Sequence, residues 1–470
     1  MTYDINNAPL SWRHIRIVGV ASLGQLIGTG LATLVSVIIP LYQITAHPEL
    51  SSFLQGLVGA MDLIGIMIGS SIFGKLSERY GYLIFFRLCP LIICGAAILS
   101  LFIHSLPVLI ICLFIMGFGI GGEYSLDSDY ISELMPVKWR FIMVGSAKAA
   151  SALGNIIVAG VCFLIVRNWT DADLWPHLMW IIIVISGLMF LLRIRFWQSP
   201  KWLLNHGKIK EAQEDTIHFL GPDVTISLED KKKNPEMDSV KKEAQNTISN
   251  ASVKKKSSSS FFLSNWKKII YTGIPWACEG LGVYGIGVFL PILVMALGLE
   301  HTNPGELPIH HVASSVEITL WISCIILPGF ILGLSLINHV DAAKIQLVGF
   351  LLSAVSLFIL LLAYHNHWAK WISIIAFMTF ELFLNMGPHL ITYVLPPKVY
   401  PVTDRGLGSG IAASLGKVGA VLGVFFIPVL LHSGGSKLVL IVSIIVMLVG
   451  GLVTFIFNPE RGKKIIVKSS

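Results

Sequence analysis

The chain has 470 residues, of which 54% are hydrophobic and 13% are charged, and its mean hydropathy is +0.75. Soluble domains carry about 25% charged residues, so the composition excludes a soluble protein and leaves no room for a large extramembrane domain. The apolar residues gather in uninterrupted runs of about 20, enough to cross a hydrocarbon core of about 30 Å as helices. Such runs are too long for the alternating strands of an outer-membrane barrel. The expected fold is therefore an all-α membrane protein.

Twelve apolar runs are predicted to span the membrane, starting near residues 17, 54, 84, 107, 142 and 178, and near 268, 313, 345, 370, 406 and 437. Between the two sets of six, LLNHGKIKEAQEDTIHFLG (203–221) favours a short amphipathic helix. Residues 231–260 are rich in Lys and Ser, which predicts disorder. We expect a six-helix lobe over 1–197, a linker over 198–266, and a six-helix lobe with a tail over 267–470.

Lys and Arg gather in alternate loops and at both ends of the chain. Under the positive-inside rule this pattern puts both termini in the cytoplasm. The net charge of +7 then reflects topology, so no nucleic-acid partner is expected. We expect a monomeric, multi-pass protein of a cell membrane, the inner membrane of a bacterium. The basic residues that define the pattern are Arg13, Arg16, Lys75, Arg79, Arg87, Lys138, Arg140, Lys398, Arg405, Arg461, Lys463, Lys464 and Lys468.

The chain lacks patterns typical of enzymes and metal sites. GFGIGG (117–122) matches a nucleotide-binding fingerprint, but no strand precedes it, so these glycines indicate close helix packing. No nucleophile–base arrangement or phosphate loop is present, and we expect no enzyme activity and no cofactor. All six cysteines lie in apolar runs without metal-site spacing, so neither a metal nor a disulfide is expected: Cys89, Cys94, Cys112, Cys162, Cys278 and Cys324.

Several motifs resemble the major facilitator superfamily. GKLSERYG (74–81) is similar to its signature after the second helix, and RFWQSPKWLL (195–204) to the sugar-porter element after the sixth. GGEYSLDSDYISE (121–133) and NMGPHLITYVLPPKVYP (385–401) resemble the phosphate–proton symporter branch. The two halves of the chain also contain similar segments, GSAKAAS (145–151) and GSGIAAS (408–414), as expected of an internal repeat. The resemblance implies a major facilitator fold, with the substrate between two six-helix lobes.

The resemblance and the charges of the spans together suggest substrate-binding residues. Lys148 and Lys417 place cations in the Gly/Ala-rich spans that should line the cavity, which favours an anionic or zwitterionic ligand; the alternative for Lys148 is snorkelling to the cytoplasm. The chain departs from the branch at Gly280, where an Asp is usual, and at His389, where an Asn is usual. The predicted substrate-binding residues are Tyr124, Lys148, Trp276, Tyr284, His389 and Lys417.

Carboxylates inside the spans are candidates for proton coupling, because span 1 contains no acid. At 100° per residue, Glu123 and Asp127 share one face of span 4 with Tyr130, and Glu123 lies about 15 Å from the rim residue Glu133. We expect Glu123 near the midplane, within reach of Lys148, or else held in a permanent structural pair. The predicted proton-coupling residues are Glu123, Asp127, Asp62 and Glu279.

A second charged group is predicted at the cytoplasmic rim. Glu133 should bind Arg79, Arg140 or the turn Gln198–Lys201, and with Glu78 should form a latch that closes this side. The combined pattern predicts proton-coupled alternating-access transport of a small polar metabolite, with phosphate or an organic anion favoured. The alternatives are a sugar or polyol porter and a nutrient receptor that does not transport.

Overall fold

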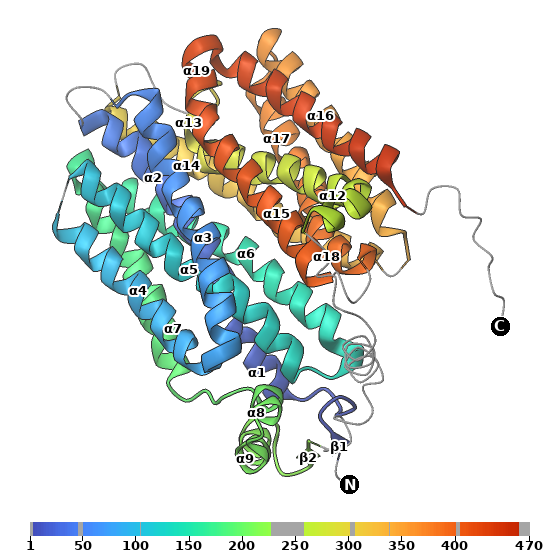
Figure 1. The fold of residues 1–470 in the computed structure, drawn as a ribbon. Helices are drawn as coiled ribbons and strands as arrows, with labels where there is room; N and C mark the ends of the chain where they lie inside the picture. The colour runs from blue at the N-terminus through green and yellow to red at the C-terminus, as the bar shows by residue number, and fades with distance from the viewer. Residues whose placement is uncertain are drawn as a thin grey trace.

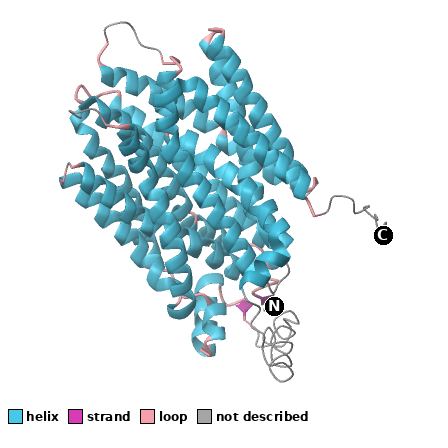
Figure 2. Ribbon diagram, turned by 45° about the horizontal axis from the view of Figure 1, so that its top comes forward, coloured by secondary structure: helices cyan, strands magenta, loops and turns pink. Residues whose placement is uncertain are grey.

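The computed structural model describes residues 3–45, 50–103, 105–226, 258–300, 306–337, 339–400 and 405–459. Within these ranges the protein is almost entirely helical, with one pair of two-residue strands (Figure 2). The segment predicted to be disordered, 231–260, lies outside the described residues as far as 257, and its last residues, from Ser258, are helical.

The first six spans form the N-terminal lobe, drawn in blue to green in Figure 1. Span 1 is broken at Ser22 into α1 and α2. The helices are α1 (Trp12–Ala21), α2 (Leu23–Thr45), α3 (Ser52–Tyr80), α4 (Tyr82–Phe102), α5 (Leu106–Leu134), α6 (Val137–Val166), and α7 (Met179–Arg193) with the preceding turn η1 (Ala172–Leu178).

The other spans form the C-terminal lobe, drawn in yellow to red beside the first (Figure 1). Here α12 and α13, joined by a π-helical segment, are bent by 66° and form one broken span. The helices are α12 (Ser258–Gly280), η2 (Leu281–Ile286), α13 (Leu290–Ala296), α14 (Pro308–Cys324), α15 (Ile326–Leu336), α16 (Ala342–His365), α17 (Lys370–Met386), α18 (Pro388–Val399) and α19 (Arg405–Phe457).

The described residues contain ten helices that are long and apolar enough to cross a membrane, and the bent pair α12–α13 adds an eleventh span. The helix α19 is interrupted at Gly435, whose backbone is not helical (φ 64°, ψ −172°), so its 53 residues make two spans. The predicted twelve-span, two-lobed membrane fold is confirmed.

The predicted linker helix is also confirmed. It consists of α8 (Pro200–Asn205) and α9 (Ile209–Leu220), and α9 buries one face through Ala212, Thr216 and Phe219. Beside it, β1 (Tyr3–Asp4) pairs in parallel with β2 (Val224–Thr225), which ties the N-terminal segment to the linker (Figure 1). We call this side of the molecule the linker end.

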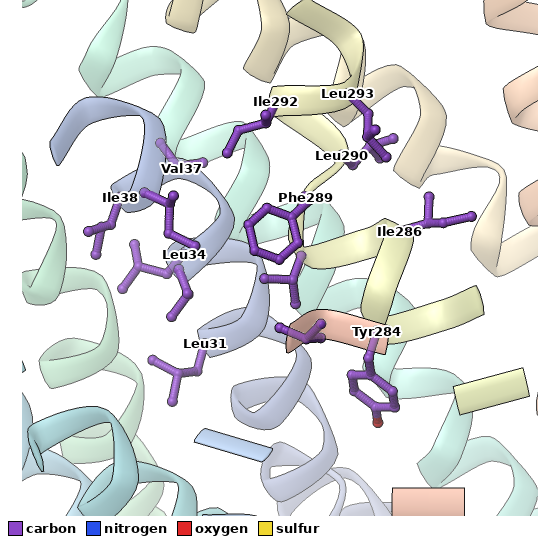
Figure 3. Packing of buried hydrophobic residues seen from close by; sticks show 14 of the residues in the cluster. Leu31, Leu34, Val37, Ile38, Tyr284, Ile286, Phe289, Leu290, Ile292 and Leu293 are labelled. Atoms are coloured by element: carbon purple, nitrogen blue, oxygen red, sulfur yellow. The ribbon is translucent and has the colours of Figure 1, made fainter. Parts of the chain in front are cut away.

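The lobes pack together through α3 against α19 and through α6 against α14. At the end opposite the linker, the rings of Phe53 and Phe425 meet edge to face, 5.3 Å apart. An apolar seal lies there too, where α2 packs against α13; it contains Leu31, Leu34, Val37 and Ile38 of α2 together with Phe289, Leu290, Ile292 and Leu293 (Figure 3). The lobes are therefore closed at the end opposite the linker.

Glycines allow α3 and α5 to pack backbone to backbone, as GFGIGG indicated. A Cβ added at Gly117 would collide with the backbone of Asp62, and one at Gly121 would collide with Ile66. Likewise, a Cβ added at Gly65 or Gly69 of α3 would collide with the backbone of α5. This close contact fixes the position of Asp62 and of the acidic half of α5.

Substitution of Gly117 by alanine tests this packing. Gly117→Ala should lower the stability by about 1–3 kcal/mol, because a single methyl group overpacks two backbones. Gly95 on α4 has open space around the position of a Cβ, so Gly95→Ala should leave stability unchanged or raise it by about 0.4–1 kcal/mol. Thermal unfolding in detergent measures both variants, and equal unfolding temperatures would contradict the packing.

Candidate functional site

A cavity of about 710 Å³ lies between the two lobes. Its lining on α3 comes from residues 66–71 of a helix that ends at Tyr80, and on α19 from residues 410–418 of a helix that begins at Arg405. The cavity is therefore on the linker side of the apolar seal. All six residues predicted to bind substrate line it, as do Glu279 and the polar residues Gln25, Ser70, Ser71, Ser125, Tyr393 and Ser414.

Two lysines from opposite lobes reach into this cavity. Lys148 projects from α6, and its Nζ lies 5.6 Å from the ring centre of Tyr124 on α5. Lys417 projects from α19, and its Nζ lies 5.3 Å from the same ring and 4.8 Å from that of Tyr284. All three distances suit a cation over an aromatic face. The alternative that Lys148 snorkels to the rim is therefore wrong.

Lys417 also donates a hydrogen bond from Nζ to the hydroxyl of Tyr284 over 3.5 Å. Tyr284 lies in the π-helical segment that breaks span 7, and its hydroxyl points away from the apolar seal (Figure 3). Breaks of this kind occur often at functional sites because they release backbone groups and redirect side chains. The broken span thus places a polar aromatic side chain at the end of the cavity nearest the apolar seal.

Glu279 is the acidic residue of the cavity wall. Its Oε1 lies 3.8 Å from Nδ1 of His389, and it lies in electrostatic range of both Lys148 and Lys417. His389 follows Pro388, the first residue of α18, at the break that separates α17 from α18. The wall therefore combines two lysines with one carboxylate and one imidazole.

Asp62 lies behind this wall, and its side chain is 1% exposed. One oxygen accepts a hydrogen bond from the amide of Leu63 over 2.7 Å, and the other has no hydrogen-bond partner. Lys417 lies in electrostatic range of the Asp62 carboxylate. Asp62 does not line the cavity.

The expected contact between Glu123 and Lys148 is wrong, because Glu123 is bonded to Arg193 instead. Arg193, the last residue of α7, binds Glu123 through Nη1 and Asp127 through Nη2, the latter at 3.4 Å. All three side chains are at most 1% exposed. The shared face of Glu123 and Asp127 thus points into the N-terminal lobe and away from the cavity, which matches the alternative of a structural pair, with a different cation.

Other contacts complete the Arg193 site. Nη2 donates to the carbonyl of Ala21 over 3.2 Å, a carbonyl at the break in span 1, and the guanidinium lies 4.5 Å from the ring centre of Phe86. Gly24, just past the break, leaves the space that Glu123 and Asp127 occupy. The sequence pattern did not indicate this role for Arg193, because a basic residue at the end of a span is typical of the cytoplasmic rim.

Glu381 is a second residue that the sequence interpretation omitted. It lies in the middle of α17, is 5% exposed, and accepts a hydrogen bond from Nδ2 of Asn385 over 3.1 Å. The only signal in the sequence is an acid inside an apolar run, AFMTFELFLNM (376–386), which is unusual in a membrane span.

Glu133 contacts one of its three predicted partners. Glu133 accepts hydrogen bonds from Tyr82, over 2.9 Å, and from Ser199 in the turn Gln198–Lys201, one of the three expected partners. Among the described residues, neither Arg79 nor Arg140 forms an ion pair with it. Arg79 is exposed.

Arg140 instead donates to Asn6 over 3.4 Å. Asn6 also accepts a hydrogen bond from Lys201, over 3.0 Å. These contacts fasten the linker to the N-terminal lobe and do not join the lobes. The latch function of Glu78, Arg79, Glu133 and Arg140 stays a prediction.

Two six-helix lobes around a charged central cavity define a secondary transporter of the major facilitator superfamily, and not an enzyme. The chain belongs to the sugar (and other) transporter family, whose profile matches residues 11–465.

Several relatives match the chain along most of its length. The inner membrane metabolite transport protein YgcS of Escherichia coli K12 is 25% identical over 459 residues, which cover 97% of this chain and 94% of that protein. The repressible high-affinity phosphate permease of Neurospora crassa is 22% identical, with 99% and 88% covered. The inorganic phosphate transporter 1-1 of Arabidopsis thaliana is 26% identical, with 87% and 84% covered.

Solved structures support the fold. The partially occluded inward-open form of the xylose transporter XylE from E. coli matches with a TM-score of 0.73 at 18% identity, covering 95% of this chain and 100% of that one. A crystal structure of a D-xylose–proton symporter matches with a TM-score of 0.75 at 17% identity, covering 95% and 98%. At these identities the likeness shows the fold alone.

The pairing of Arg193 yields a stability prediction. Arg193→Gln leaves two buried carboxylates without their cation, which should cost about 3–5 kcal/mol. Arg195→Gln changes an exposed arginine two residues further on and should have no measurable effect. Thermal unfolding in detergent compares the two variants.

Removal of the carboxylates provides the complementary variant. Adding Glu123→Gln and Asp127→Asn to Arg193→Gln should recover part of the lost stability, since the triple variant buries no net charge at this site. Equal instability of the single and triple variants would show that the ion pairs are not what holds this region together.

Proposed function

We propose that the protein is a proton-coupled symporter for a small anion, with inorganic phosphate or a small organic anion favoured. The observation that carries the proposal is the pair Lys148 and Lys417, which approach one cavity from opposite lobes. An anion between them would interact with both lobes at once. The names of the relatives, a metabolite transport protein and two phosphate carriers, support the same class of substrate.

The proposed orientation places the linker end in the cytoplasm. It rests on the basic residues of the alternate loops, and it puts both termini on the cytoplasmic side. The cavity would then face inward, with the apolar seal on the outside. We propose the inner membrane of a bacterium as the location, a monomer as the working unit, and the division into 1–197, 198–266 and 267–470 as the moving parts.

The chemistry of the cavity suits a small oxyanion. Lys148 and Lys417 would supply positive charge, while the hydroxyls of Tyr124 and Tyr284 and the indole N–H of Trp276 would donate hydrogen bonds without adding fixed charge. A charged ligand that touches both lobes favours their approach. Rocking of the lobes around this site would expose it alternately to the two sides of the membrane.

Glu279 offers a link between the anion and a proton. When ionised, it compensates Lys148 and Lys417 and competes with the substrate for them. When protonated, it leaves both lysines free for the anion. Anion and proton would therefore bind together. Glu123 and Asp127 are the candidates for a second proton site, because two carboxylates share the single guanidinium of Arg193.

The charge of the ligand is tested at Lys148. Lys148→Gln should weaken the binding of inorganic phosphate, or of a small organic anion, tenfold or more, on the order of 1–3 kcal/mol for a lost charge-assisted hydrogen bond. Lys344→Gln, at an exposed lysine near the start of α16, should leave binding unchanged. Isothermal titration of the purified protein measures both affinities.

The same titration separates the alternatives. Binding of D-xylose by the wild type, with no binding of phosphate or of small carboxylates, would favour a sugar porter. Binding of an anion without any uptake into proteoliposomes would favour a receptor that does not transport.

Proton coupling is tested at Glu279. Glu279→Gln mimics the protonated form, so it should abolish uphill uptake of inorganic phosphate while sparing its exchange across the membrane. Both are measured in the same proteoliposomes under an imposed proton gradient. Glu317→Gln, at an exposed carboxylate of α14, serves as the control. Accumulation retained in Glu279→Gln but lost in Glu123→Gln would move the coupling site to Glu123.

A further inference from the structure

A second, much smaller cavity of about 40 Å³ lies between the lobes, and we call it the interlobe chamber. Its walls come from α2 and α6 of one lobe and from η2, α13, α15, α17 and α18 of the other. A water molecule needs about 10–15 Å³ of such space, so the chamber can hold one or more. The lining residues are Thr29, Ser151, Asn155, Val283, Gly287, Leu290, Ile326, Glu381, Asn385 and His389.

Glu381 is the only carboxylate among the residues that line the chamber. Asn385 donates to its Oε2 over 3.1 Å, and no described lysine, arginine or histidine forms an ion pair with it. Its situation differs from that of Glu123 and Asp127, which share a guanidinium, and from that of Glu279, which lies near two lysines. A buried carboxylate without a cation is far more costly to keep ionised than to keep protonated.

The opposite wall of the chamber is polar and belongs to the other lobe. Thr29 donates to the carbonyl of Ser151 over 2.6 Å, and Thr33, one turn further along α2, donates to the side chain of Asn155 over 2.9 Å. These contacts keep the wall formed by α2 and α6 intact when the lobes separate. Because the wall is part of the N-terminal lobe, rocking of the lobes would withdraw it from Glu381.

His389 connects the chamber with the substrate cavity, because it lines both. Its Nδ1 has no hydrogen-bond partner and lies 3.8 Å from Oε1 of Glu279. The edge-to-face contact with Phe330, at 5.2 Å between ring centres, holds the imidazole in place. An imidazole can accept a proton at one nitrogen and release one from the other, so this position suits proton transfer between Glu381 and Glu279.

We propose that Glu381 binds the coupling proton from the side opposite the linker, and that His389 passes it to Glu279 in the substrate cavity. This inference rests on the proposed proton-coupled transport. When the lobes part at the apolar seal, water reaches Glu381, and a hydronium ion gives its proton to the carboxylate. Closure then traps the neutral acid. The proton moves to His389 while His389 releases one to Glu279, and Glu279 loses it to cavity water, so one proton enters and one leaves.

Protonation of Glu381 therefore controls closure of the seal. Among the lining residues, α2, α6, η2, α13 and α15 contribute no charged group, so the only other titratable side chain in the chamber is His389. The charges that act on His389 are Glu279, Lys148 and Lys417 in the adjoining cavity. Closing the seal over an ionised Glu381 is unfavourable, so the closed state should gain population as pH falls.

The test measures closure directly, without substrate. Genetically encoded spin-label residues at Ser51 and Ser433, both exposed near the end opposite the linker, leave the native cysteines in place. Pulsed electron–electron double resonance in nanodiscs then measures the distance between the two spin labels, one on each lobe, at about pH 5.5 to 8.5. In the wild type, linkage to one proton should change the ratio of closed to open molecules by up to about tenfold per pH unit.

Glu381→Gln mimics the protonated acid, so this variant should stay closed at every pH. Glu317→Gln should behave as the wild type does. A wild type that does not respond to pH, or a Glu381→Gln variant that responds as the wild type does, would overturn the inference. A change in the ratio of closed to open molecules caused by Na⁺ at fixed pH would assign the chamber to sodium and overturn the proton assignment.

A second arm tests the route through His389. In vesicles that contain a pH dye, influx of inorganic phosphate through the wild type should acidify the interior, and His389→Asn should abolish the acidification. Acidification retained in His389→Asn would overturn the relay. If the wild type takes up no phosphate at all, the proposed substrate is wrong, while the distance measurement still decides the role of Glu381.

Discussion

The constraint on which this structure depends is the cost of burying charge in a membrane. A lone ionised side chain at the centre of the bilayer costs several kcal/mol, so it needs a partner, a cavity or a proton. The N-terminal lobe meets this constraint internally, because Arg193 binds Glu123 and Asp127. Arg193 belongs to α7 and both carboxylates belong to α5 of the same lobe, so rocking of the lobes leaves the pairs unchanged.

At the interface between the lobes, the buried charges are only partly compensated. Lys148 belongs to one lobe, whereas Lys417 and Glu279 belong to the other, and two lysines face one carboxylate in the cavity wall. Any movement of the lobes alters these distances and therefore the electrostatic energy. An anion would supply the missing negative charge, and a proton on Glu279 would leave both lysines without a carboxylate and so increase the need for the anion. The incomplete pairing is thus what makes the energy of the interface depend on ligands.

The sequence predicted which residues belong to the site better than it predicted which of them form ion pairs. Lys148, Lys417 and Trp276 could be assigned to the cavity because span boundaries and family motifs place them on the spans between the lobes. Helical periodicity correctly grouped Glu123 with Asp127. It could not show which way their face points, because that depends on how α5 is rotated against α3 and α4. Arg193 could not be recognised as their partner, because a basic residue at the end of a span is typical of the cytoplasmic rim.

The family motifs give no indication of Glu381. Position 381 lies outside the motifs that carry the family resemblance. Composition alone marks the residue, since an acid in the middle of an apolar span is rare. In the structure its importance comes from what is absent within the described residues, namely an ion-pair partner.

Three of the breaks inside the spans follow from the same constraint. Irregular backbone inside a membrane is tolerated where protein or a polar cavity satisfies the freed groups. The break in span 1 offers the carbonyl of Ala21 to Arg193, and the π-helical break in span 7 redirects Tyr284 toward Lys417. The break in span 10 comes directly before His389. Each of these breaks therefore adjoins a charged or titratable group, and the two in the C-terminal lobe lie where the groups proposed to carry substrate and proton meet.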